Sequence, residues 1–155
     1  MTVHQAVLEE ARTAIAAAPD ATSAMETTVR LLAARMADYT WVGIYLLFGN
    51  ELVLGPFVGK PSPHTRIPLG RGICGAAASE KATIIVDDVN DDPRYLACSL
   101  ETRSEIVVPI LTRVGENDVL GEIDVDSNRR AAFGAPDKDL LEAIAALLAP
   151  RLSRA

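Results

Sequence analysis

Cysteine and histidine are scarce in this chain of 155 residues, which holds only Cys74, Cys98, His4 and His64. These four residues are too few and too scattered for a structural zinc site, and the two cysteines do not form a thioredoxin-like C-x-x-C motif. In a reducing compartment both thiols stay free. Each cysteine is therefore either a small buried hydrophobic residue or a reactive group.

Long apolar runs are also absent. The stretch Val42–Phe48 is far shorter than the roughly 20 residues that span a bilayer. The N-terminus, MTVHQAVLEEA, has neither the basic region nor the apolar core of an export signal. We therefore expect a cytoplasmic protein without a transmembrane helix.

An excess of basic residues is lacking as well. The chain has 15 Lys and Arg against 21 Asp and Glu, a formal net charge of −6, and the basic residues form no stripe. This argues against a nucleic-acid surface. With 49% hydrophobic and 23% charged residues, the composition is typical of one globular domain.

Apolar spacing predicts helices at both ends of the chain. Residues 3–18 and 25–36 carry apolar side chains at helical intervals, and Ser23 with Glu26 resembles a capping box that opens the second helix. A third helix is expected from about Pro136, with acidic residues in its first turn.

The central part of the chain predicts strands joined by hairpins. The turn signals Gly49-Asn50 and GEN each separate two strand-like runs. Pro109 inside one run suggests an edge position or a bulge. Between the hairpins we expect a loop over 58–69, a short helix from near Ile73 and a strand over 83–89. This order predicts an α+β fold, an antiparallel sheet with the terminal helices on one face and loops roofing a pocket on the other.

Strand alternation predicts which side chains face the pocket. Glu122, Asp124 and Asp126 alternate with an apolar face that should meet the helices, formed by Val119, Gly121, Ile123 and Val125. By the same alternation Trp41 and Tyr45 can share the carboxylate side. The pattern alone leaves a plain alternative, in which the carboxylates are solvated on an exposed strand face and the aromatic residues belong to the core.

The two cysteines are both expected outside the strands. Cys74 lies where a glycine-rich turn leads into a helix, and the positive end of the helix dipole should lower the pKa of its thiol. Cys98 lies in a polar loop segment, seven residues before Glu105. The alternative for each is an inert small residue.

Gly70, Gly72 and Gly75 satisfy the dinucleotide-binding pattern G-x-G-x-x-G, but two helices and a hairpin precede them and no parallel alternation follows. We interpret these glycines instead as a tight turn whose backbone amides face a ligand.

Taken together, these residues resemble the GAF-domain free methionine-(R)-sulfoxide reductases over nearly the whole chain, which implies a single GAF-like domain over residues 1–155. The most specific segments are WVGIY (41–45), LVLGPFVGK (52–60), GRGICGAAAS (70–79), the region from YLACS to SEIVVPI (95–110) and GEIDVDS (121–127).

The resemblance implies thiol-dependent reduction of free L-methionine (R)-S-oxide to methionine, with thioredoxin as the reductant, no cofactor and a homodimer. Cys98 matches the cysteine that attacks the sulfoxide, and Cys74 a partner that resolves it by forming a disulfide. Carboxylates around the sulfoxide oxygen and the substrate's amino group, and an aromatic pocket wall, are matched by Glu105, Asp124, Asp126, Trp41 and Tyr45.

This chemistry explains the residue types. A sulfoxide oxygen leaves only when it is protonated, and a carboxylic acid can supply that proton. Because crowded carboxylates do not all ionise readily, we expect at least one of them to have a raised pKa. The remaining negative charge suits the ammonium group of a free amino acid.

One position departs from the family's pattern. Members commonly carry a third cysteine in the loop before the glycine-rich turn, where this chain has His64. Cys74 or an external thiol must then resolve Cys98. The alternatives are a non-catalytic GAF module that binds a small molecule and a thiol redox sensor. The absence of an output segment in these 155 residues favours the enzyme.

Overall fold

The computed structural model describes residues 1–96, 100–112 and 118–152. In chain order the elements are α1 (Val3–Ala17), α2 (Ala21–Arg35), β1 (Trp41–Phe48), β2 (Glu51–Val58), β3 (Arg66–Pro68), α3 (Gly72–Glu80), β4 (Ile84–Val86), the 3₁₀ turn η1 (Val89–Asp91), β5 (Ser104–Leu111), β6 (Val119–Ser127) and α4 (Ala135–Leu152).

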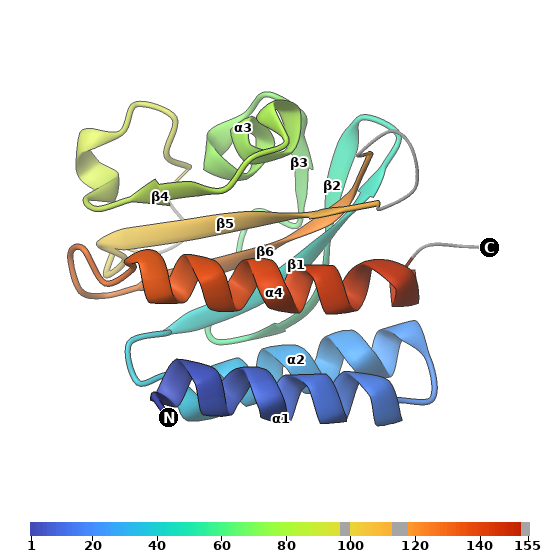
Figure 1. Ribbon diagram of the computed structural model, residues 1–155. Helices are drawn as coiled ribbons and strands as arrows, with labels where there is room; N and C mark the ends of the chain where they lie inside the picture. Colours follow the sequence, from blue (N-terminus) through green and yellow to red (C-terminus); the bar gives the residue numbers. More distant parts are fainter. Residues whose placement is uncertain (97–99, 113–117, 153–155) are drawn as a thin grey trace.

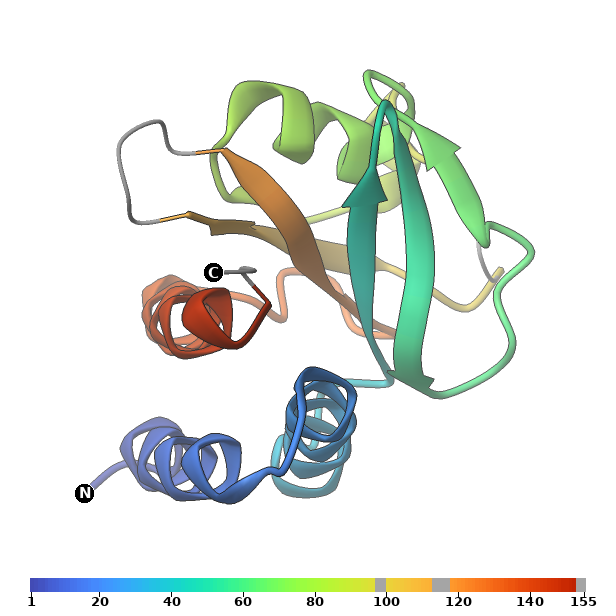
Figure 2. The same cartoon turned by 90° about the vertical axis from the view of Figure 1, so that its right-hand side faces the viewer.

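The strands form one antiparallel sheet in the order β3-β2-β1-β6-β5-β4. Helices α2 and α4 pack on one face, and α1 packs on those two helices (Figure 1). Helix α3 lies on the other face, as the turned view in Figure 2 also shows. The predicted α+β fold is confirmed. Within the described ranges, no helix combines the length and apolarity needed to cross a membrane.

Strand alternation divides the sheet into two apolar faces. Val42, Ile44 and Ile123 point toward the terminal helices and belong to the larger core. Trp41, Tyr45 and their neighbours point the other way, into a smaller core under α3 that also contains Ile73, Cys74, Ala77 and Val107. A sheet buried on both faces encloses whatever polar side chains lie between its apolar residues.

The second helix begins earlier than the sequence pattern indicated. The Asp20 carboxylate accepts a hydrogen bond from the Ser23 backbone amide at 2.7 Å and caps α2. The predicted Ser23–Glu26 capping box is therefore wrong. Asp20 supplies an acceptor three residues before Ser23, directly after the proline that ends the first helix, so Ser23 already lies inside the first turn.

The predicted loop over 58–69 contains the short strand β3. Its three residues pair with the first half of β2, from Glu51 to Val53, at the sheet edge. An edge strand tolerates Pro68 because its outward side makes no ladder hydrogen bonds. The local pattern gave no alternation from which this pairing could be predicted.

Pro109 occupies a position with edge character, as predicted. Strand β5 lies between β6 and β4, but β4 pairs only as far as Val107. At Pro109 the sole partner is Glu122 of β6. On its β4 side Pro109 has no neighbouring strand, so a proline at this position interrupts no pairing there.

A β-bulge at the start of β6 changes the alternation there. Ile110 pairs with Gly121 and Leu111 with Val119, so Leu120 is the extra residue. Leu120 consequently packs with the helix-side core, and Val119 packs on the α3 side. The expected helix-facing position of Val119 is wrong, whereas those of Ile123 and Val125 are confirmed.

Two glycines provide the space that the Trp41 indole occupies. A Cβ added at Gly43 would lie 2.6 Å from the indole Cζ3, and one at Gly59 would lie 2.6 Å from Cδ1. Gly59 also has a positive φ of 131°, which L side chains rarely adopt. The indole lies across its own strand because these two positions lack a side chain.

Replacement of Gly43 by alanine should displace the Trp41 ring and destabilise the fold by about 1–3 kcal/mol, the usual cost of overpacking. Urea unfolding measures this loss, and the emission of the single tryptophan reports the ring's environment. Gly134→Ala is the matched control, because the nearest atom to its added Cβ lies 3.7 Å away. Equal stability of the two variants would contradict the packing described.

Candidate active site

Four carboxyl groups lie side by side on the α3 face of the sheet. In the strand register, Asp126 pairs with Trp41 and Glu105, Asp124 with Gly43, and Glu122 with Tyr45. Their exposed fractions are 0% for Glu122, 2% for Asp124, 3% for Asp126 and 5% for Glu105. The alternative of a solvated strand face is therefore wrong.

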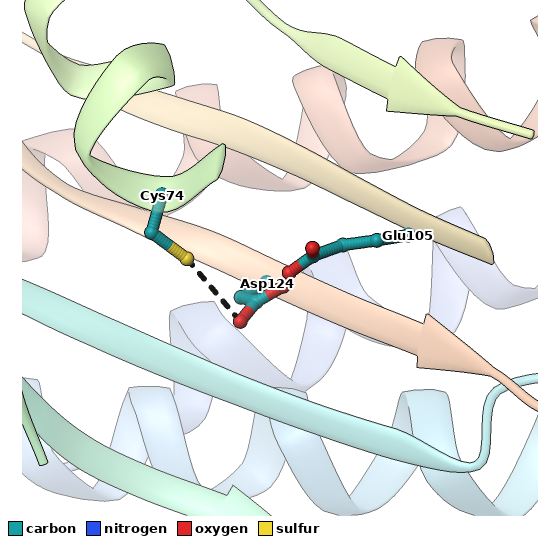
Figure 3. A group of neighbouring side chains, drawn as sticks. All are labelled: Cys74, Glu105 and Asp124. Carbon is teal, nitrogen blue, oxygen red and sulfur yellow. Dashed lines mark hydrogen bonds between the residues drawn. The ribbon is translucent and has the colours of Figure 1, made fainter. Parts of the chain in front are cut away.

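Cys74 approaches this acidic face from the first turn of α3. Its thiol donates a hydrogen bond to Asp124 Oδ2 at 3.3 Å, and Glu105 points toward the same place from β5 (Figure 3). One donor atom from each of Cys74, Glu105 and Asp124 lies within 4.8 Å of the others. Helix α3 and the consecutive strands β5 and β6 thus bring one thiol and two carboxyl groups together.

The expectation of an activated thiol at Cys74 is wrong. The side chain is buried, and burial raises the pKa of the thiol well above its usual value. The nearby carboxylates of Asp124, Glu122 and Glu105 raise it further, because each disfavours a second negative charge. These effects outweigh the helix dipole, which is why position in the first turn was a poor guide to the pKa.

The expectation of a raised carboxyl pKa is confirmed. Burial raises the pKa of Asp124 and of Asp126, and the charge of Asp124 raises that of Asp126 further. Hydrogen bonding with Glu105 offsets part of the rise at both residues. The cluster can therefore hold protons at a pH where isolated carboxyl groups are ionised.

Glu122 is a fourth member of the cluster. Strand alternation predicted that it faces the pocket, but no role in the site was assigned to it. Neither of its carboxyl oxygens has a hydrogen-bond partner among the described residues. Burial, followed by the charge of Asp124, raises its pKa well above the usual value, and the nearby Cys74 thiol offsets part of this rise. Its place in the alternation with Asp124 and Asp126 was the signal that could have identified it.

Aromatic side chains stand beside the carboxyl groups, as the alternation predicted. The Trp41 indole Nε1 donates to the Lys60 carbonyl at 2.9 Å, and the Tyr45 hydroxyl donates to the His64 carbonyl at 2.8 Å. Phe57, which the sequence analysis did not single out, stacks on Trp41 with ring centroids 5.7 Å apart. These hydrogen bonds attach the loop over 59–65, between β2 and β3, to the site.

Two hollows open on this face. One contains the thiol and is lined by Tyr45, His64, Ile67, Gly72, Ile73, Cys74, Leu96, Glu105 and Asp124. The other is lined by Thr40, Trp41, Lys60, Ser62, Glu101, Thr102, Asp126 and Asn128. All the predicted site residues that the structure describes line one hollow or the other. Cys98 lies outside the described residues.

The glycine-rich turn has a structural role. Gly70 and Gly72 have positive φ values of 84° and 67°. The Gly70 amide donates to the Gly75 carbonyl, and the Arg71 amide donates to the Pro68 carbonyl. The expectation that the amides of these glycines face a ligand is wrong for Gly70 and Gly75, because the Gly75 amide likewise donates within the turn, to the Arg71 carbonyl. A Cβ at Gly72 would lie 2.8 Å from Leu96 Cδ1. The absence of a side chain at Gly72 therefore leaves room for Leu96, which lines the hollow.

Replacement of Glu122 by glutamine should weaken the pH dependence of stability. Unfolded Glu122 ionises near pH 4, whereas the folded side chain keeps its proton to a higher pH. Its contribution to the free energy of unfolding is thus full below about pH 4 and is lost as the pH rises toward the folded pKa. Glutamine ionises in neither state, so the variant should gain on the order of 1 kcal/mol relative to wild type between pH 5 and pH 8.

Urea unfolding at the two pH values measures this difference. Glu142→Gln is a suitable control, since that carboxylate lies on the exposed side of α4, where it accepts from the Thr83 hydroxyl. Parallel pH profiles for Glu122→Gln and wild type would show that Glu122 is ionised in the folded protein.

Known proteins are similar to this chain both in sequence and in architecture. Residues 20–152 match the GAF domain family. A free methionine-R-sulfoxide reductase of Saccharomyces cerevisiae is 46% identical over 114 residues, covering 72% of this chain and 62% of the yeast protein. The corresponding reductase of Escherichia coli is 37% identical over 124 residues, covering 80% of this chain and 73% of that protein.

A free methionine-R-sulfoxide reductase from Neisseria meningitidis, solved in complex with its substrate, superimposes with a TM-score of 0.89. The two chains are 36% identical, and the match covers 96% of this chain and 87% of the other. The matched region spans less than two thirds of the yeast relative but most of the bacterial ones. The chain therefore belongs to the GAF-domain family of free methionine-(R)-sulfoxide reductases.

Proposed function

We propose that this protein reduces free L-methionine (R)-S-oxide to L-methionine by thiol chemistry. The observation that carries the proposal is the buried cluster of Cys74, Glu105 and Asp124 beneath a hollow walled by Tyr45. It combines a thiol with carboxyl groups that hold protons, which are the two requirements of sulfoxide reduction. The family's named reductases support the same substrate.

Cys98 is the proposed nucleophile and Cys74 the resolving thiol. The first attack needs a thiolate, and the raised pKa of Cys74 keeps its thiol protonated at neutral pH. Cys98 lies two residues after Leu96 in the sequence, and Leu96 lines the hollow that contains Cys74. This division of roles gives the buried thiol, whose pKa is raised, the second step.

The carboxyl groups serve first as proton donors and then as proton acceptors. Asp124 or Glu105 protonates the sulfoxide oxygen as Cys98 attacks the sulfur, which yields methionine and a sulfenic acid on Cys98. The resulting carboxylate then accepts the Cys74 thiol proton, along the hydrogen bond that Asp124 already forms. Cys74 attacks the Cys98 sulfur, and hydroxide leaves and takes up that proton as water.

Recycling restores both thiols. A dithiol, proposed to be thioredoxin, reduces the Cys74–Cys98 disulfide and is itself oxidised to a disulfide. Each turnover thus consumes one sulfoxide and one dithiol and releases methionine and water. No third cysteine takes part, because the loop position of the family's extra thiol holds His64, whose backbone carbonyl accepts from Tyr45.

Preference for the free amino acid follows from charge. Asp126 lies in the hollow beside Trp41, and its buried carboxyl group is suited to the ammonium of a free substrate. A methionine sulfoxide within a peptide lacks that ammonium group. Trp41 and Tyr45 are proposed to enclose the methyl and methylene groups of the substrate.

A thioredoxin-coupled assay with the separate epimers of free methionine sulfoxide tests this function. Turnover is expected with the R epimer and not with the S epimer or with an N-acetylated R epimer, whose ammonium is removed. If neither the R nor the S free epimer is turned over, the reductase is excluded, and the binding or redox-sensing GAF module is left. Sedimentation of the same preparation tests the homodimer that the family resemblance implies.

Thiol counting tests the two-cysteine cycle. Reduced protein given stoichiometric substrate without reductant should lose two free thiols for each methionine formed, because both electrons come from the Cys74–Cys98 pair. Cys74→Ser should form one methionine per chain, lose one thiol and retain a sulfenic acid that a selective reagent traps. Wild-type turnover of Cys74→Ser with thioredoxin would show that Cys74 does not resolve Cys98.

A further inference from the structure

The cavity around Cys74 holds a donor set that suits a metal ion. Cys74 offers a sulfur ligand, and Glu105 and Asp124 offer oxygen ligands, all within 4.8 Å of one another. Zinc binds this mixture of sulfur and carboxylate ligands, whereas calcium and magnesium prefer oxygen alone. The small number of histidines and cysteines argued against a structural zinc site. That argument did not include carboxylate ligands, because only the fold brings Glu105 and Asp124 to Cys74.

The spacing is close to that of a tetrahedral site. Zinc–sulfur bonds near 2.3 Å and zinc–oxygen bonds near 2.1 Å place ligand atoms about 3.6 Å apart in a tetrahedron. Cys74 Sγ and Asp124 Oδ2 already lie 3.3 Å apart. The Glu105 donor lies within 4.8 Å of the Cys74 and Asp124 donors, at most about 1.2 Å beyond the tetrahedral spacing.

Unsatisfied buried oxygens beside these ligands indicate independently that the cavity lacks positive charge. Asp124 Oδ1, Asp126 Oδ1 and both oxygens of Glu122 have no hydrogen-bond partner in the described part of the chain. No lysine or arginine is among the residues that line the Cys74 hollow; its one basic side chain is His64. Lys60, at the other hollow, pairs with Glu101 at 2.6 Å.

We propose that Cys74, Glu105 and Asp124 bind one zinc ion, which closes the cavity to the substrate and takes the thiol out of the redox cycle. Binding displaces the Cys74 thiol proton and the protons of ligating carboxyl groups, so zinc and hydrogen ions compete. Zinc and the substrate also compete, because both require these carboxyl groups. This second competition, unlike zinc binding itself, rests on the proposed function.

Equilibrium dialysis of the reduced full chain against zinc chloride tests the site, with metal content measured by atomic emission. We expect one tight zinc ion per chain. Cys74→Ser and Asp124→Asn should each weaken binding by more than about tenfold, since loss of even an outer-shell partner costs about 10–100-fold. Affinity should rise about tenfold per pH unit for each proton displaced.

Cobalt(II) provides a readout that does not depend on activity. A thiolate-to-cobalt charge-transfer band is expected in the wild type and in Asp126→Asn, and not in Cys74→Ser. The controls His4→Gln and Cys98→Ser should bind zinc as the wild type does. Binding that survives Cys74→Ser but is lost in either control would overturn the proposal, as would absence of a tight ion.

Competition separates this proposal from the catalytic one. In Cys98→Ser, which lacks the proposed nucleophile and so keeps the Cys74 thiol reduced, free methionine (R)-sulfoxide should raise the apparent dissociation constant for zinc in proportion to its concentration. A protein that binds zinc through Cys74 but does not reduce the sulfoxide would retain the metal site and lose the proposed function. A protein that reduces the sulfoxide and binds no zinc would retain the proposed function and lose the metal site.

Discussion

Burial of carboxyl groups on one face of the sheet is the constraint on which the site depends. Glu105, Glu122, Asp124 and Asp126 are all nearly inaccessible to solvent, and α3 places a thiol above them. Removing an ionised carboxylate from water raises its free energy. A buried carboxyl group is therefore more stable in its protonated form when no cation is nearby. The same desolvation raises the pKa of Cys74, which keeps that thiol neutral beside the acidic cluster.

The larger core makes this arrangement possible. Helices α2 and α4, with α1 packed on them, cover one face of the sheet, where Val42, Ile44 and Ile123 are fully buried. Hydrophobic burial at about 25 cal/mol per Å² on that face stabilises the sheet independently of the polar face. The α3 face can therefore hold groups that oppose folding. The separation of a stabilising face from a reactive one follows directly from the period of two along each strand.

That period is also why much of the site could be predicted from the sequence. It predicts that Trp41 and Tyr45 share a face with Asp124 and Asp126, and the register confirms the grouping. Glu122 follows the same pattern, yet it was not assigned because the family resemblance supplied no role for it. The pKa of Cys74 could not be predicted from its place in the first turn of a helix, since it is raised by burial and then by the carboxyl groups of β5 and β6, which only the fold brings to the thiol.

The bulge at Leu120 has a consequence for how this strand can vary. It inserts one residue between the hairpin end of β6 and the segment that carries Glu122, Asp124 and Asp126. The two parts of the strand therefore alternate with opposite phase, as the opposite orientations of Val119 and Ile123 reflect. Substitutions at the hairpin end can follow their own inside-outside pattern while the carboxyl groups keep theirs, so the two segments are free to diverge separately.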